Sequence, residues 1–162
     1  MTLAWARLDF DFETNEVLVE EVQSDLVRDI GQMKKYAWAA KTRKKDHFYF
    51  WGTRIQVREF DQFADAFLFA FKSTWQEAML AATVSFAFDE LGVKHLYYHT
   101  FKSGSVLKNI GNTQPPRSLY SELPEKFCFN ETQSAPEFLK KDKRARRKLK
   151  KIKDCRWFYM AA

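Results

Sequence analysis

The stretch Val17-Leu18-Val19-Glu20-Glu21-Val22-Gln23-Ser24-Asp25 decides the fold, because it reads as a β-strand that runs directly into a polar cluster. Three carboxylates, one amide and one hydroxyl fall within its last six residues. Ser24 and Asp25 can each cap a following helix, since a short side-chain oxygen accepts a backbone N–H of the first turn. The stretch therefore predicts a strand, a capped helix start and a candidate site at one place.

The residues before this stretch predict the other half of a β-hairpin. Residues 3–12 alternate, with Ala4, Ala6, Leu8, Phe10 and Phe12 on one face. A period of two over this length indicates a strand with one buried face. The polar residues 13–16 form a turn, and the chain returns through residues 17–23.

The remaining chain predicts a single α/β (α+β) domain over residues 1–162. Its sheet is mixed and mostly antiparallel, and helices flank it. After the helix that starts at Ser24, residues 36–56 show no clean period and predict a loop or short strand. The predicted helices are 58–71, 74–91, 105–110, 119–122 and 137–153, and the later strands are 94–100, 126–129 and 156–160. The helix 137–153 is expected as a basic insertion in the last hairpin.

Composition indicates a folded domain. The chain has 162 residues, of which 46% are hydrophobic and 17% aromatic, enough for one core. Its longest apolar runs are far shorter than the ~20 residues that span a membrane, and no signal-peptide core is expected at the start. Two cysteines without metal-ligand spacing predict reduced thiols, no zinc site and a cytoplasmic protein.

The positive charge is concentrated in one segment. Residues 140–153 carry ten Lys or Arg and one Asp, whereas the net charge of the whole chain is only +6. Such density predicts either contact with a polyanion such as nucleic acid, contact with acidic groups of the same protein, or a solvated helix face. The predicted phosphate contacts are Lys140, Lys141, Lys143, Arg144, Arg146, Arg147, Lys148, Lys150 and Lys151.

The order hairpin, helix, strand, short helix and final strands resembles the core of the GCN5-related N-acetyltransferases. The matching residues are the run Trp75–Gly92, the strand Lys94–Thr100 and the segment Leu119–Phe127, which is similar to the family's L-Y-x-x-x-G-F pattern. The resemblance implies a GNAT-like fold, N-acyltransferase activity and a general-acid role for Tyr120. The family's [QR]-x-x-G-x-[GA] loop, which holds the phosphates of coenzyme A, is absent. Acetyl-CoA is therefore expected only at an atypical site, or the cofactor site is lost.

A second resemblance rests on Glu20–Asp25. This run resembles the E-E-[IV]-Q-S-D motif in domains of large polyvalent proteins from phages and mobile elements. Those domains also carry a Lys-x-x-Trp before an Ala-rich helix, matched here by Lys72-Ser73-Thr74-Trp75. The resemblance implies a phage-type origin, and in that case the host cytoplasm as the location and a host protein as a further candidate partner.

Two functional hypotheses follow. The first is an acyltransferase-like domain with catalytic and binding residues near the end of the 17–23 strand. Its candidate catalytic residues are Glu21, Asp25, His99 and Tyr120, and its candidate binding residues are Gln23, Ser24, Lys72, Trp75 and Lys102. The second is a non-catalytic module that binds nucleic acid or a host protein through residues 140–153. Each site residue also has an ordinary structural alternative: Asp25 as a helix cap, Glu20 and Glu21 as solvated strand residues, and His95, His99 and Tyr120 as hydrogen-bonded core residues.

Overall fold

A computed structural model describes residues 2–108 and 115–162, and the chain forms two compact units. The sheet unit comprises residues 6–22 and 76–162. The helical unit comprises residues 23–75 together with residues 2–5. The predicted end of the 105–110 helix lies outside the described residues. The assignment of the whole chain to one domain stays a prediction.

The sheet unit is built on a five-stranded mixed sheet with the order β1-β2-β5-β7-β6. Its strands are β1 (Trp5–Asp11), β2 (Glu16–Gln23), β5 (His95–His99), β6 (Asn130–Thr132) and β7 (Trp157–Ala161). β2 and β5 run parallel, while β7 is antiparallel to both β5 and β6. The four-residue turn between β1 and β2 makes that pair antiparallel too, because parallel strands need a much longer crossover. The predicted class, a mixed and mostly antiparallel sheet flanked by helices, is confirmed.

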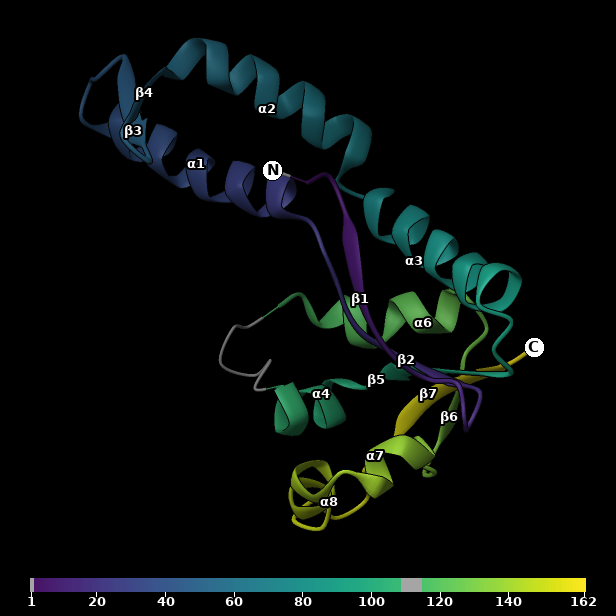
Figure 1. Ribbon diagram of the computed structural model, residues 1–162. Helices are drawn as coiled ribbons and strands as arrows, with labels where there is room; N and C mark the ends of the chain where they lie inside the picture. The colour runs from purple at the N-terminus through teal and green to yellow at the C-terminus, as the bar shows by residue number, and fades with distance from the viewer. Residues whose placement is uncertain (1, 109–114) are drawn as a thin grey trace. The chain divides into compact units, whose positions relative to one another are not determined.

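Helices cover both faces of this sheet (Figure 1). On one face, α4 (Phe101–Lys108), α7 (Glu137–Lys141) and α8 (Lys143–Leu149) enclose a core. Its buried members are Leu18, Tyr97, Leu139, Ala145 and Trp157. On the other face, the 3-10 helix η2 (Arg117–Tyr120) and α6 (Glu122–Lys126) bring Tyr120 against Tyr98, with ring centroids 6.1 Å apart. The helix α3 (Trp75–Ser85) continues through the π-helix η1 (Phe86–Glu90) and ends at Gly92, whose φ is +64°.

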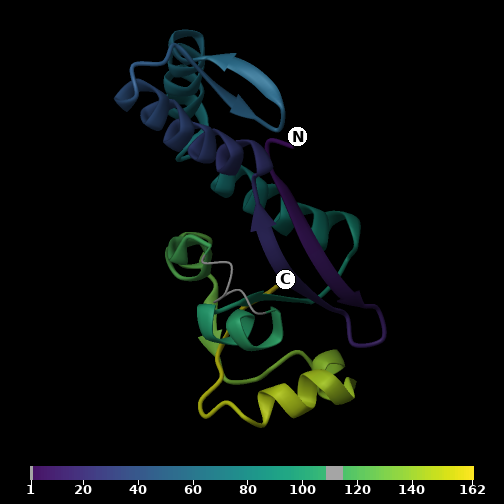
Figure 2. The same cartoon turned by 90° about the vertical axis from the view of Figure 1, so that its left-hand side faces the viewer.

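The helical unit is a pair of helices with a β-ribbon between them. The helices are α1 (Asp25–Thr42) and α2 (Val57–Phe71), and the ribbon consists of β3 (His47–Phe50) and β4 (Thr53–Gln56). The ribbon lies where α1 ends and α2 begins, as Figure 1 and Figure 2 show. The core joins both helices and the ribbon, and it contains Ile30, Met33, Ala37, Ala40, Phe48, Val57, Phe60 and Ala64.

Some sequence predictions about these elements are corrected. Residues 36–56, predicted as a loop or short strand, do contain the short strands β3 and β4, but their first part is helical: α1 continues to Thr42, because Ala37 and Ala40 extend the buried stripe of Ile30 and Met33. The last short strand lies at 130–132 and not at 126–129. Phe10 and Phe12, predicted on the buried face, are more than half exposed, and their rings pack on one another with centroids 4.9 Å apart.

The predicted basic helix 137–153 is also corrected. It is two short helices that meet at Asp142, whose Oδ1 accepts a hydrogen bond from the Ala145 backbone N–H at 2.6 Å. An Asp in this position starts a new helix, since its carboxylate replaces the missing intrahelical acceptor. The segment does lie between the last two strands, β6 and β7.

Candidate functional site

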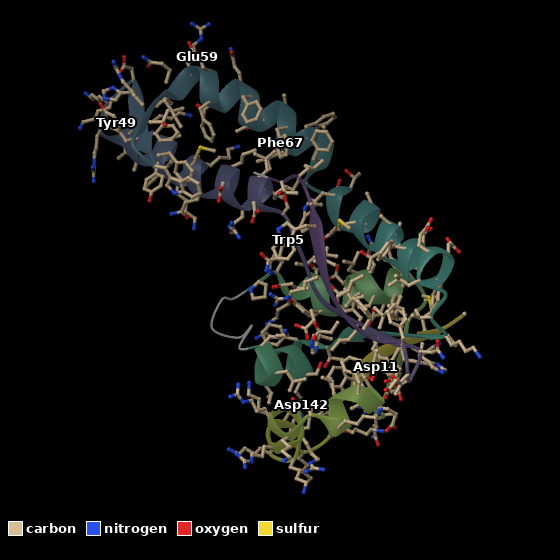
Figure 3. The ribbon with its side chains drawn as sticks, viewed as in Figure 1. Trp5, Asp11, Tyr49, Glu59, Phe67 and Asp142 are labelled. Carbon is tan, nitrogen blue, oxygen red and sulfur yellow. The ribbon has the colours of Figure 1, made fainter. Side chains whose placement is uncertain are left out.

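The basic segment, defined here as residues 140–153, lies on the outside of the sheet unit. Ala145 is buried and Leu149 half-buried, and these two residues anchor α8 on the core beneath it. The ten Lys and Arg side chains of the segment are all exposed. Figure 3 shows Asp142 where the two helices meet, with side chains projecting outward from α8. The apolar side of α8 thus packs on the core, and its densely cationic side faces solvent.

Few of these cations have an acidic partner. Lys140 pairs with Glu137, and Lys141 Nζ lies 3.4 Å from Glu13 Oε2. Lys148 Nζ donates to the Leu107 carbonyl at 3.0 Å. Of the ten cations two have carboxylate partners, so among the described residues the other eight have none. The acidic groups of the same unit therefore leave most of this charge uncompensated.

The second polar feature is a buried cluster at the end of β2. Glu20 is almost completely buried, and its carboxylate contacts the Lys108 ammonium group. Arg7 reaches both neighbouring carboxylates, with Nη2 2.6 Å from Glu21 Oε1 and 3.7 Å from Glu20 Oε2. His99 Nε2 lies 3.7 Å from Glu20 Oε1. The parallel register that pairs Val19 with Tyr98 places these last two residues side by side.

His99 is neutral in this cluster. Its side chain is 0% exposed, and desolvation by burial lowers its pKa to about 4, although Asp9 and Glu21 act in the opposite direction. Its Nδ1 lies 3.0 Å from Ser103 Oγ, and Nε2 has no hydrogen-bond partner among the described residues. The contact with Glu20 is therefore a polar contact between a carboxylate and a neutral ring. In this position His99 is a core residue that joins β5 to α4.

The predicted catalytic residues occupy both units. Glu21, His99 and Tyr120 belong to the sheet unit, whereas Asp25 belongs to the helical unit and pairs with Arg28 at 2.9 Å. Burial, followed by the charge of Glu21, raises the pKa of Tyr120 to about 12, so this phenol stays protonated at neutral pH. Tyr120 is 5% exposed. Their catalytic roles stay predictions.

The predicted binding residues are likewise distributed. Ser24 caps α1 by accepting the Val27 N–H at 3.1 Å, as the sequence predicts. Gln23, Lys72 and Trp75 also belong to the helical unit, where Trp75 is buried and Lys72 exposed. Lys102 belongs to the sheet unit and donates to the carbonyls of Lys153 and Asp154, so it holds the end of the basic segment.

Sequence reasoning missed three partners of the buried cluster: Arg7, Ser103 and Lys108. One signal was available for Glu20 itself, because it shares a strand face with Leu18 and alternation predicts burial for that face. No local signal points to Lys108, which is brought to Glu20 only by the packing of α4 on the sheet.

Comparisons of the chain with family models, with curated proteins and with solved structures found no match. Among the described residues, no helix is both long and apolar enough to cross a membrane. Within residues 2–108 and 115–162, no group of three or more His, Cys, Asp or Glu side chains is arranged to hold a metal ion.

Proposed function

We propose that the protein binds nucleic acid through its basic segment, by contacts to the phosphate backbone. The observation that supports this is the absence, among the described residues, of carboxylate partners for eight exposed cations on α8 and the loop that follows it. Uncompensated like charges three or four positions apart destabilise a short helix. A polyanion relieves this repulsion, and the release of its counterions favours binding.

The contacts are expected to be independent of base sequence. Lys and Arg side chains on an exposed, charged helix reach phosphate oxygens, which carry no sequence information. The four residues of the segment that are not Lys or Arg are Asp142, Ala145, Leu149 and Ile152, so it has no Asn or Gln to pair with adenine. The proposal is therefore a general affinity for nucleic acid that falls steeply with salt.

A matched pair of charge reversals tests this function. Arg144→Glu changes an exposed cation of α8, and Lys94→Glu makes the same charge change at an exposed lysine just before β5. Binding of a short labelled DNA duplex is followed by fluorescence anisotropy at about 50 mM salt. Arg144→Glu should weaken binding several-fold, and Lys94→Glu should change it much less. Equal effects of the two variants, or no duplex binding by the wild type, would refute the proposal. In the latter case an acidic surface of a host protein is the alternative partner.

Acyl transfer is the second candidate, favoured by the order of the elements. The hairpin β1–β2, the helix α3, the strand β5, short helices and the strands β6 and β7 come in the order that the resemblance to the N-acetyltransferases implies, with α1, the β3–β4 ribbon and α2 inserted between β2 and α3. Binding of acetyl-CoA to the folded chain should raise the melting temperature, because a ligand that binds only the folded state stabilises it. No shift at about millimolar cofactor would remove this candidate.

A further inference from the structure

The turn of the β3–β4 ribbon holds a tryptophan in an unfavourable place. Trp51 and Gly52 are the two turn residues between Phe50 and Thr53, with φ of +48° and +79°. Tight hairpin turns with two positive φ values favour Asn-Gly, and a bulky residue in the first position is a conformational outlier. Trp51 is also 78% exposed. Neither its backbone conformation nor its exposure favours folding, so its presence points to a role in binding.

Trp51 is one end of a continuous aromatic surface. Its ring stacks on Phe50, with centroids 5.2 Å and ring planes 11° apart, and Phe50 in turn lies 6.2 Å from Tyr36 of α1. Tyr49 projects from the opposite face of the ribbon and is 60% exposed (Figure 3). Strand alternation explains the division, since Phe48 and Phe50 face the helices while Tyr49 faces solvent. Flat aromatic faces are thus presented on both sides of the ribbon.

The segment that carries these rings is rich in cations. Residues 34–58 carry eight Lys or Arg and one Asp. Lys34 and Lys41 pair with carboxylates of α2. Among the described residues the remaining cations near the ribbon have no carboxylate partner and are exposed: Lys35, Arg43, Lys44, Lys45, Arg54 and Arg58.

Trp38 is a further exposed ring of α1, on a different side of the helix from Tyr36, because positions two apart do not face each other. It is 70% exposed and lines an open hollow of about 530 Å³ with Lys34, Lys35 and Ala39. This exposed indole, with two lysines lining the same hollow, provides a further flat face beside positive charge.

We infer that this end of the helical unit, the aromatic tip (Tyr36, Trp38, Tyr49 and Trp51 with the cations of residues 34–58), binds single-stranded nucleic acid. A single strand offers unpaired base faces for stacking and phosphates for the cations, and this combination is how sequence-tolerant single-strand binding arises. A duplex hides its base faces, and an acidic peptide supplies only the charge. The inference shares no residue with the basic segment and does not rest on its function.

The test compares two exposed aromatic residues of the same unit in the full-length chain. Trp51→Ala removes the ring at the turn, and Phe69→Ala removes a 93% exposed ring from α2. Anisotropy of a labelled oligo-dT of about 16 nucleotides reports binding. We expect Trp51→Ala to weaken single-strand binding on the order of tenfold, Trp51→Phe to retain much of it, and Phe69→Ala to leave it unchanged. The wild type should also show quenching of tryptophan fluorescence, and Trp51→Ala should lose a large part of it.

Two further measurements keep this result separate from the basic segment. The variant Arg144→Glu/Arg147→Glu should weaken duplex binding. When Trp51→Ala is added to this variant, the affinity for oligo-dT should fall by the same factor as it does in the wild type. Melting curves confirm that each variant is folded. Equal oligo-dT affinities of Trp51→Ala and Phe69→Ala would overturn the inference even if duplex binding through the basic segment holds. Binding of a poly-glutamate peptide as tightly as oligo-dT would overturn it in favour of an acidic protein partner.

Discussion

Glu20 Oε1 lies 3.7 Å from His99 Nε2, and both side chains are buried beneath α4. Burial holds the pKa of His99 at about 4, below its ordinary value of 6.5. The unfolded chain therefore binds a proton between these two pH values while the folded chain does not. Stability from this group is complete above pH 6.5 and is lost as the pH falls toward 4, by up to about 3 kcal/mol.

Thermal unfolding of wild type and His99→Gln between pH 7.5 and 4 tests this first prediction, where the range follows from the two pKa values. The glutamine keeps a polar side chain but cannot take up the proton. The wild-type melting temperature should therefore fall more steeply below about pH 6.5 than that of the variant. If the melting temperatures of the two proteins fall in parallel, the pKa of His99 is not lower in the folded chain than in the unfolded chain, and the prediction is wrong.

The ion pair of Glu20 and Lys108 predicts a coupled mutational effect. Lys108→Met leaves a buried carboxylate without its ammonium partner, and Arg7 compensates only in part from 3.7 Å. We expect the free energy of unfolding to fall by about 3 kcal/mol. The double variant Glu20→Gln/Lys108→Met removes both charges and should recover part of that loss. Chemical denaturation of the two single variants and the double variant measures the coupling, and strictly additive effects would contradict it.

Asp142 should stabilise α8 as its N-cap. Asp142→Ala removes the acceptor of the Ala145 N–H and should lower stability by about 1 kcal/mol. Asp142→Asn is the matched control, because it removes the same charge and keeps a side-chain oxygen that can cap. Circular dichroism and thermal unfolding should therefore separate Ala from Asn. The same loss in both variants would indicate a charge effect in place of capping.

Trp51 predicts a conflict between stability and binding. Trp51→Asn places the preferred residue at a positive φ beside Gly52 and should relieve about 1 kcal/mol of backbone strain. Loss of the stacked contact with Phe50 offsets part of this gain. The variant should melt at or above the wild-type temperature while its affinity for oligo-dT falls. A variant that is both clearly less stable and unchanged in binding would assign Trp51 a structural role.

Regular local patterns were sufficient to predict much of this fold. The hairpin at 5–23, the Ser24 cap and the helix α2 follow from alternation, capping chemistry and a clear apolar stripe. Residues 36–56 carry aromatic and basic side chains without a period, so neither the end of α1 nor the ribbon could be read from them. The break at Asp142 was missed for a different reason: ten cations in 14 residues suit one long helix as well as two short ones.

The candidate site was predictable only where one segment contains all of it. The basic segment is contiguous, so its charge is visible in the sequence, although its lack of carboxylate partners is a property of the folded unit. The buried cluster brings together Arg7, Glu20, His99 and Lys108 from two strands of a hairpin, a parallel strand and a helix. Such contacts depend on sheet order and helix packing, which local patterns do not determine.

The salt dependence of duplex binding tests the central claim most directly. Each phosphate that the basic segment neutralises contributes about −0.9 to the slope of log K against log salt concentration. With eight cations free of carboxylate partners among the described residues, the wild type should show a steep negative slope. Arg144→Glu/Arg147→Glu should reduce its magnitude by about 2. A slope near zero for the wild type, or an unchanged slope in the double variant, would contradict nucleic-acid binding by this segment.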